Sequence, residues 1–234
     1  MSISHYDLVV YNGSPAGIAC AVRAAREGLS VLIVNHTPIL GGMISNGLCV
    51  WDTQYEGKRS PIYDELREAM FAFYRDTYGE DSDQYKTCLP GPGGHSNGNY
   101  EPKVAQAQVE KMVSAESAID ILLRHYPAEA VRDGRAVRSV TFAEMGTDGL
   151  PKPEGERVSV TADSWADCSY EGDLMAVCGA GYRFGREAIS EFNEPHAGKI
   201  YVRPSKEPPS DRLAFLGAEH AKLNLREFPG YQEI

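Results

Sequence analysis

Long apolar segments are absent from this sequence, and no run approaches the roughly 20 apolar residues that a membrane-spanning helix needs. Clustered basic residues are absent too, since 23 Lys and Arg against 33 Asp and Glu give a net charge of −10. That balance argues against a nucleic-acid partner, which requires a basic surface. The six histidines lack the spacing of zinc ligands. We therefore expect no metal site, no membrane partner and no nucleic-acid partner.

The cysteines of the sequence show no sign of a disulfide framework or a redox motif. The five cysteines are odd in number and form no C-x-x-C motif. Such usage is typical of a reduced protein, so we expect a cytoplasmic location. The chain has 234 residues, of which 42% are hydrophobic, and is long enough to bury a substantial core in one or two domains.

The first 35 residues predict a β-turn-α-β unit. Strands are expected at residues 5–11 and 30–35, with a helix at 18–28 between them. Such a turn presents backbone N–H groups and a helix N-terminus to a pyrophosphate. The turn consists of Asn12, Gly13, Ser14, Pro15, Ala16 and Gly17. Because the unit begins so close to the first residue, we expect no signal peptide before it.

The turn departs from the G-x-G-x-x-G pattern of dinucleotide sites. With Gly17 as the third glycine, Asn12 and Ser14 occupy the first two glycine positions. Asn tolerates left-handed backbone angles, and Gly13 adds freedom one residue later. Asn35 stands where an acidic residue usually ends the second strand, and its neutral amide can hydrogen-bond a ribose hydroxyl. An ordinary βαβ unit without a nucleotide is the alternative.

A glycine doublet weakens that alternative. Gly41, Gly42 and Met43 follow the second strand closely. Paired glycines let the backbone pass near a flat or charged ligand. A glycine-rich surface turn is the competing interpretation.

The remaining pattern predicts the order of further elements. Helices are expected at 61–78 and 102–118, with a polar segment at 80–86 and a loop at 90–99 between them. Residues 119–123 predict a third parallel strand. Antiparallel meander strands are expected at 128–131, 136–143 and 157–162, before a strand at 164–168 returns to the main sheet.

Several separated motifs together resemble one family. The chain is similar to the FAD-dependent oxidoreductases of the glutathione-reductase-like superfamily, of the glycine-doublet type. The motifs that carry the likeness lie at residues 6–11, 14–19, 40–43, 101–105, 167–176, 185–187 and 194–198. In that family the residues at the positions of Asn12 and Asn35 are usually Gly and Glu.

The resemblance implies a fold and a cofactor. The fold would be α/β and Rossmann-like, of the FAD/NAD(P)-binding type, with a parallel sheet covered by helices on one face and by an antiparallel β-meander on the other. The cofactor would be FAD, with its pyrophosphate at Gly13–Gly17, its ribose at Asn35 and its flavin side near Gly41, Gly42 and Met43. Val131 in the meander is a further expected contact.

The resemblance also implies an organisation in two parts. Residues 1–182 would form the FAD-binding domain, with an insertion at about 50–100. Residues 183–234 would begin a substrate or cap region. Members of the family continue further, through a substrate domain to a C-terminal glycine segment. We therefore expect this chain to be the N-terminal part of such an enzyme, with an incomplete substrate domain.

Catalytic residues are harder to assign, because a flavin carries the redox chemistry and needs no catalytic triad. His95, Arg186, Glu187 and Cys49 are the candidates. Arg186 and Glu187 could equally form an ion pair, and Cys49 could be a buried, inert thiol. Glu171 and Asp173 are expected to cap a helix.

Three functions stay open. The first is a FAD-dependent oxidoreductase, or the cofactor-binding portion of one, that acts on a small organic substrate. The second is a non-catalytic or truncated binding module of the same fold. The third is an NAD(P)-dependent dehydrogenase, which would not explain the glycine doublet. The sequence identifies no substrate, and it allows a homo-oligomer without requiring one.

Overall fold

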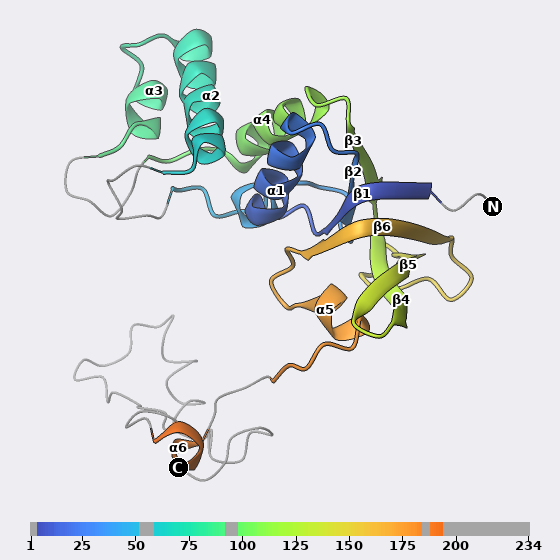
Figure 1. Cartoon of the computed structure of the whole chain (residues 1–234). Helices are drawn as coiled ribbons and strands as arrows, with labels where there is room; N and C mark the ends of the chain where they lie inside the picture. The colour runs from blue at the N-terminus through green and yellow to red at the C-terminus, as the bar shows by residue number, and fades with distance from the viewer. Residues whose placement is uncertain (1–3, 52–58, 92–97, 184–187, 194–234) are drawn as a thin grey trace. The chain divides into compact units, whose positions relative to one another are not determined.

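The computed structural model describes residues 4–51, 59–91, 98–183 and 188–193, and it divides the chain into two units, Met1–Ala180 and Gly181–Ile234. A six-stranded sheet with the order β3-β2-β1-β6-β5-β4 organises the first unit (Figure 1). The strands β3, β2, β1 and β6 run parallel, whereas β5 and β4 are antiparallel to their neighbours. This arrangement is the expected α/β, Rossmann-like fold with a meander.

The strands are β1 Ser4–Tyr11, β2 Val31–Asn35, β3 Ile119–Leu123, β4 His125–Asp133, β5 Ala136–Glu144 and β6 Arg157–Asp167. The helices are α1 Pro15–Arg26, α2 Pro61–Tyr78, α3 Asp83–Cys88, α4 Pro102–Ser114, α5 Asp173–Val177 and α6 Ile189–Phe192, together with a 3-10 turn, η1 Gly42–Ile44. None of the helices in the described ranges is long and apolar enough to cross a membrane.

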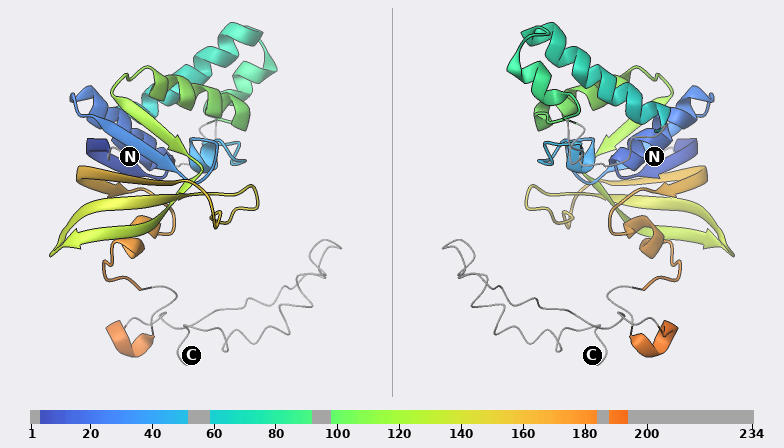
Figure 2. Two further views of the ribbon diagram at one scale, coloured as in Figure 1. Left: turned by 90° about the vertical axis from the view of Figure 1, so that its right-hand side faces the viewer. Right: turned by 90° about the vertical axis from the view of Figure 1, so that its left-hand side faces the viewer.

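The two faces of the sheet are buried by different elements. All five residues of β2 are buried, as expected for a parallel strand covered on both sides. Val31 and Ile33 pack in the core formed with α1, α2 and α4. Leu32 and Val34 alternate to the opposite face, where they pack with the meander and α5. In both views of Figure 2, α2 and α4 lie above the strands and α5 lies below them.

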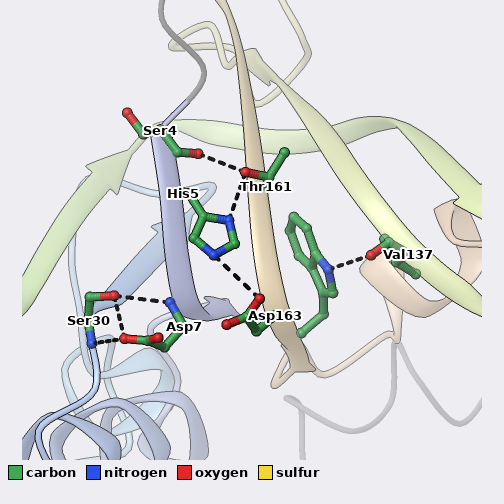
Figure 3. Close-up of polar contacts among 8 residues, drawn as sticks. Ser4, His5, Asp7, Ser30, Val137, Thr161 and Asp163 are labelled. Atoms are coloured by element: carbon green, nitrogen blue, oxygen red, sulfur yellow. Dashed lines mark hydrogen bonds and ion pairs between the residues drawn. The ribbon is translucent and has the colours of Figure 1, made fainter.

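The meander and the main sheet share one long strand, where we expected two. β6 runs without a break from Arg157 to Asp167, pairing with β5 along its first half and with β1 from Val160 onward. Asp163 lies where the break was expected. Its carboxylate is exposed and lies 3.4 Å from the Nε2 atom of His5 on the neighbouring strand (Figure 3). A polar residue can thus continue a strand when its side chain faces solvent and has a cross-strand partner.

Three helices differ from the sequence prediction, and the first of them, α1, spans Pro15–Arg26 instead of 18–28. α2 has the expected bounds, but α4 ends at Ser114 instead of 118. The amide of Val31 bonds the carbonyl of Ala118 at 2.9 Å, so Ala118 bonds to the sheet and does not continue the helix. The polar segment at 80–86 contains the start of α3, which begins after Ser82. The Ser82 hydroxyl accepts a hydrogen bond from the amide of Tyr85 at 3.1 Å and caps this helix.

Candidate cofactor site

The turn between β1 and α1 has the tight backbone that a nucleotide site requires. Asn12 has a φ of 80°, so the left-handed conformation expected at this position is confirmed. Its amide bonds the carbonyl of Val34 at 2.7 Å and joins the turn to β2. A Cβ on Gly17 would lie 1.9 Å from the carbonyl oxygen of Asn12, and a Cβ on Gly13 would lie 2.4 Å from Leu40. Packing therefore requires glycine at position 17, where the contact is with backbone, whereas at position 13 the contact is with the end of a side chain that can move.

Ser14 caps α1 instead of projecting into the space beyond the turn. Its side-chain oxygen accepts a hydrogen bond from the amide of Gly17 at 3.2 Å and donates one to the carbonyl of Cys168 at 2.7 Å. Pro15 occupies the first helical position, where a missing N–H costs nothing. Ala16 follows in the first turn, whose N–H groups lack intrahelical acceptors. The turn thus directs a helix N-terminus outward without an obstructing side chain.

The side chain of Asn35 holds the turn and the following segment together. It is 2% exposed, and its Oδ1 accepts a hydrogen bond from the amide of Gly13 at 2.9 Å. Its Nδ2 group donates to the hydroxyl of Thr37 at 2.9 Å, and to the carbonyls of Thr37 at 3.1 Å and Ile39 at 2.9 Å. We expected Asn35 at a ribose. The structure adds that its amide already has four protein contacts.

The glycine doublet packs directly against the same turn. The amide of Gly41 bonds the carbonyl of Gly13 at 2.6 Å. Gly41 and Gly42 have φ angles of 101° and 52°, which favour glycine. A Cβ on Gly42 would lie 2.3 Å from the hydroxyl of Tyr170, and that hydroxyl accepts a hydrogen bond from the amide of Met43 at 3.0 Å. The β6–α5 loop therefore fixes the position of the doublet.

These segments surround a cavity of about 340 Å³, which falls in the range of roughly 300–1,000 Å³ for ligand pockets. The wall includes four of the predicted cofactor residues, Asn12, Asn35, Gly42 and Met43. Sequence reasoning missed the other polar wall residues, which are His36, Thr37, Asn46, Tyr170 and Glu171. The motif containing Tyr170 was visible in the sequence, but its distance from the doublet concealed the contact.

Asn12 carries an unused donor at this cavity. Its side chain is 3% exposed, and its Nδ2 atom is buried without a hydrogen-bond partner in the structure. An unpaired buried donor costs roughly 1–3 kcal/mol. The Nδ1 atom of His36, another wall residue, is likewise buried and unpaired.

Carboxylates near the β6–α5 loop act on two tyrosines, and one carboxylate lines the cavity. Burial, followed by the nearby carboxylate of Asp173, raises the pKa of Tyr11. The same two causes raise the pKa of Tyr126, whose hydroxyl donates to Asp173 at 3.1 Å. Glu171 belongs to the wall itself, and no Lys or Arg is among the described wall residues. An anionic group would therefore be favoured at the N-terminus of α1, where the helix dipole is positive.

The helix α5 begins at Asp173, but its N-terminus is capped by other residues than we expected. Gly172 at the N-cap makes no side-chain capping bond. The hydroxyl of Ser169 accepts hydrogen bonds from the amides of Gly172 at 2.9 Å and Asp173 at 3.0 Å, while the carboxylate of Asp167 accepts from Met175 at 2.8 Å. Ser169 and Asp167 thus take the capping role, and Glu171 lines the cavity instead.

Comparison with known proteins identifies the family to which this chain belongs. The sequence matches the family described as FAD dependent oxidoreductase over residues 7–223. The chain belongs to this family. FAD is accordingly its cofactor.

The individual relatives of this chain are distant. A glutathione reductase of Yarrowia lipolytica is 26% identical over 203 residues, which cover 82% of this chain and 43% of the relative. An NADH:fumarate oxidoreductase of Klebsiella pneumoniae is 29% identical over 113 residues, covering 47% of this chain and 10% of the relative. The chain therefore spans less than half the length of these curated relatives.

A solved structure confirms the fold of this chain. THI4 of Thermovibrio ammonificans superposes with a TM-score of 0.51 at 15% identity, over 76% of this chain and 64% of THI4. At this level of identity the likeness concerns the fold alone.

The remaining predicted site residues are not brought to this cavity. Val131 lies on β4 with 60% of its surface exposed and is absent from the cavity wall. Cys49 is exposed, so the alternative of a buried thiol is wrong, and it lies at another cavity with Tyr74 and Tyr100. The other three catalytic candidates, His95, Arg186 and Glu187, lie outside the described residues.

Proposed function

We propose that this chain is the cofactor-binding portion of an oxidoreductase that exchanges hydride or electrons between a small organic substrate and FAD. In this assignment, residues 1–182 form the FAD-binding domain and residues 183–234 begin the substrate region. The observation that carries the proposal is the unpaired, buried Nδ2 donor of Asn12 at the cavity between the turn and the doublet. When bound, the flavin supplies the redox chemistry.

The protein groups have separate roles in this proposal. The N-terminus of α1, with the amide of Ala16, receives the pyrophosphate, because both backbone donors and the dipole favour an anion there. The Nδ2 group of Asn12 donates a charge-assisted hydrogen bond to a phosphate oxygen. Asn35 holds the turn in shape from behind and contributes to the ribose end of the cavity. Tyr170 holds Gly42 and Met43 in place, close to the flavin side.

Asn12 then takes over part of what a glycine does in other members of the family. A glycine at this position lets a phosphate approach the backbone closely, whereas Asn12 reaches the phosphate with its amide. The left-handed backbone is available to both residues. The absence of Lys and Arg from the described wall makes this neutral donor more important.

The test is a titration of the purified chain with FAD, followed by flavin fluorescence. We expect saturable binding, and an Asn12→Gly variant should keep the backbone conformation but bind FAD about tenfold more weakly, as expected for one hydrogen bond to a charged group. Asn193→Gly is the matched control, since Asn193 is also left-handed, with a φ of 56°, and lies outside the cavity wall.

Other outcomes would point to the alternatives. No FAD binding by a folded chain would favour a binding module that has lost its cofactor. Binding of NADPH without any response to FAD would favour the dehydrogenase alternative. Equal FAD affinities of the wild-type chain and the Asn12→Gly variant would agree with FAD as the cofactor, but they would show that Asn12 does not bond the phosphate.

A further inference from the structure

Two cysteines that are distant in sequence meet beside the nucleotide turn. Cys20 lies in the second turn of α1, and Cys168 directly follows β6, where its amide bonds the carbonyl of Tyr11 at 2.9 Å. The Cβ of Cys168 is 3.3 Å from the place where a Cβ on Gly17 would stand. Cys20 is three residues further along the same helix face. The side chains of Cys20 and Cys168 both pack against the same hydrophobic core cluster.

The surroundings of this cysteine pair favour a reactive thiol over an inert one. Both residues are partly exposed, whereas Cys88 is fully buried. The hydrogen bond from Cys168 lowers the pKa of the Cys20 thiol, because it stabilises the thiolate. The same hydrogen bond and burial raise the pKa of Cys168. The pair thus combines a nucleophilic sulfur with a protonated neighbour.

We propose that Cys20 and Cys168 form a reversible disulfide site, with a peroxide as the oxidant. In the first step the thiolate of Cys20 attacks one oxygen of hydrogen peroxide, the O–O bond breaks, and Cys20 becomes a sulfenic acid while one water is released. In the second step the sulfur of Cys168 attacks the sulfenic sulfur, the S–S bond forms and a second water leaves. In total, two thiols lose two electrons and two protons, and one peroxide becomes two waters.

The disulfide would join two elements that already meet at Ser14. The hydroxyl of Ser14 bonds the carbonyl of Cys168 at 2.7 Å and caps α1 through Gly17. A bond from Cys20 to Cys168 fixes the start of α1 to the end of β6 on both sides of this cap. Oxidation should therefore raise the midpoint of thermal unfolding by several degrees. The site needs no bound cofactor, so it is independent of the proposed function.

The experiment treats the purified, reduced chain with hydrogen peroxide at pH 7, blocks free thiols with N-ethylmaleimide and maps disulfides by mass spectrometry after tryptic digestion. Cys20 lies in the peptide 1–23 and Cys168 in the peptide 158–183, which also contains Cys178. We expect these two peptides to be cross-linked in the wild-type chain and in the Cys178→Ser variant. The cross-link should be absent from Cys20→Ser and Cys168→Ser, and it should disappear with dithiothreitol.

A second arm separates a built site from random pairing. The wild-type chain is oxidised under the same conditions in 8 M urea, and the Cys20–Cys168 cross-link should form at least tenfold more slowly there. Equal rates in the folded and unfolded chain would overturn the proposal. Persistence of the cross-link in Cys168→Ser, or its absence while the exposed Cys49 is oxidised, would also overturn it.

Discussion

The amide oxygen of Asn35 accepts a hydrogen bond from the backbone N–H of Gly13 at 2.9 Å, across the two strands of the nucleotide-binding unit. The other end of the same side chain donates to residues 37 and 39. Asn35 therefore joins the turn after β1 to the segment before the glycine doublet. A carboxylate could accept the bond from Gly13, but it could not donate the others.

The first prediction concerns Asn35→Asp. The variant keeps the acceptor for Gly13 but places a buried charge against the carbonyls of Thr37 and Ile39. We expect the free energy of unfolding to fall by about 3 kcal/mol at pH 7, measured by urea denaturation. FAD affinity should fall with it.

Asn46→Asp is the control for this change. Asn46 also lines the cavity, but it is exposed and its amide makes one bond, to the carbonyl of Gly42 at 2.7 Å. Its replacement should cost about 1 kcal/mol or less. Tighter FAD binding by a fully stable Asn35→Asp variant would contradict the prediction, because it would show that this side chain faces a ribose and not the turn.

The second prediction concerns the contact between Gly42 and Tyr170. Gly42→Ala places a Cβ 2.3 Å from the Tyr170 hydroxyl and 3.1 Å from the Cα of Ser14. Tyr170→Phe removes only the acceptor for the amide of Met43. We expect Tyr170→Phe to weaken FAD binding about fivefold, the effect of one neutral hydrogen bond, and Gly42→Ala to weaken it more.

A double-mutant cycle can separate these effects. If the clash with the tyrosine dominates, Tyr170→Ala should restore part of the affinity that Gly42→Ala loses, so the two effects should not add. Full additivity would show that the left-handed backbone of Gly42, with its φ of 52°, is the main cost. Isothermal titration calorimetry with FAD measures both cases.

The sequence predicted what is encoded locally. The strand at Ile119–Leu123 and the helix α2 have the expected bounds, since each follows from the spacing of apolar residues within one segment. The left-handed Asn12 and the two close-packed glycines of the turn also follow from local rules. The geometry of the turn was therefore predictable.

Features that depend on distant segments were not predictable. The unbroken course of β6 depends on its pairing with both β1 and β5. The contact of Tyr170 with Gly42 and the meeting of Cys20 with Cys168 each join parts of the chain that lie more than 100 residues apart. Asn35 shows the same limit, because its partners at 37 and 39 depend on the path of a loop that has no periodic pattern.

The third prediction concerns Gly17→Ala. The new Cβ would lie 1.9 Å from the carbonyl oxygen of Asn12, which is backbone and cannot rotate away. We expect a loss of about 3 kcal/mol in unfolding free energy, because the turn must separate from α1. Gly91→Ala is the control, since a Cβ there meets nothing within 4 Å. A loss below about 1 kcal/mol for Gly17→Ala would show that the turn is looser than its geometry indicates.

The last prediction concerns the pH dependence of an ion-pair network that joins α1 to α2. Arg26 contacts Glu65 at 2.7 Å and Glu116 at 2.7 Å, and its hydrogen bonds to Glu65 lower the pKa of that carboxyl. A carboxyl with a lowered folded-state pKa stabilises the protein above its unfolded pKa, and this contribution is lost as the pH falls through the folded pKa. Because the side chains of Arg26 and Glu65 are more than one-third exposed, solvent screening keeps the effect small.

We therefore expect Arg26→Ala to lower the unfolding free energy by about 1 kcal/mol at pH 7. The difference from the wild-type chain should decrease as the pH falls below about 4.5 and should vanish once the pH is below the lowered pKa of Glu65, where that carboxyl is protonated. Arg23→Ala is the matched control, since among the described residues Arg23 pairs with Glu27, the C-cap of the same helix, and its loss should cost roughly 0.3 kcal/mol. Urea denaturation of the three proteins between pH 2 and pH 7 measures the effect, and a pH-independent difference would show that Arg26 acts through packing of its aliphatic stem instead of its charge.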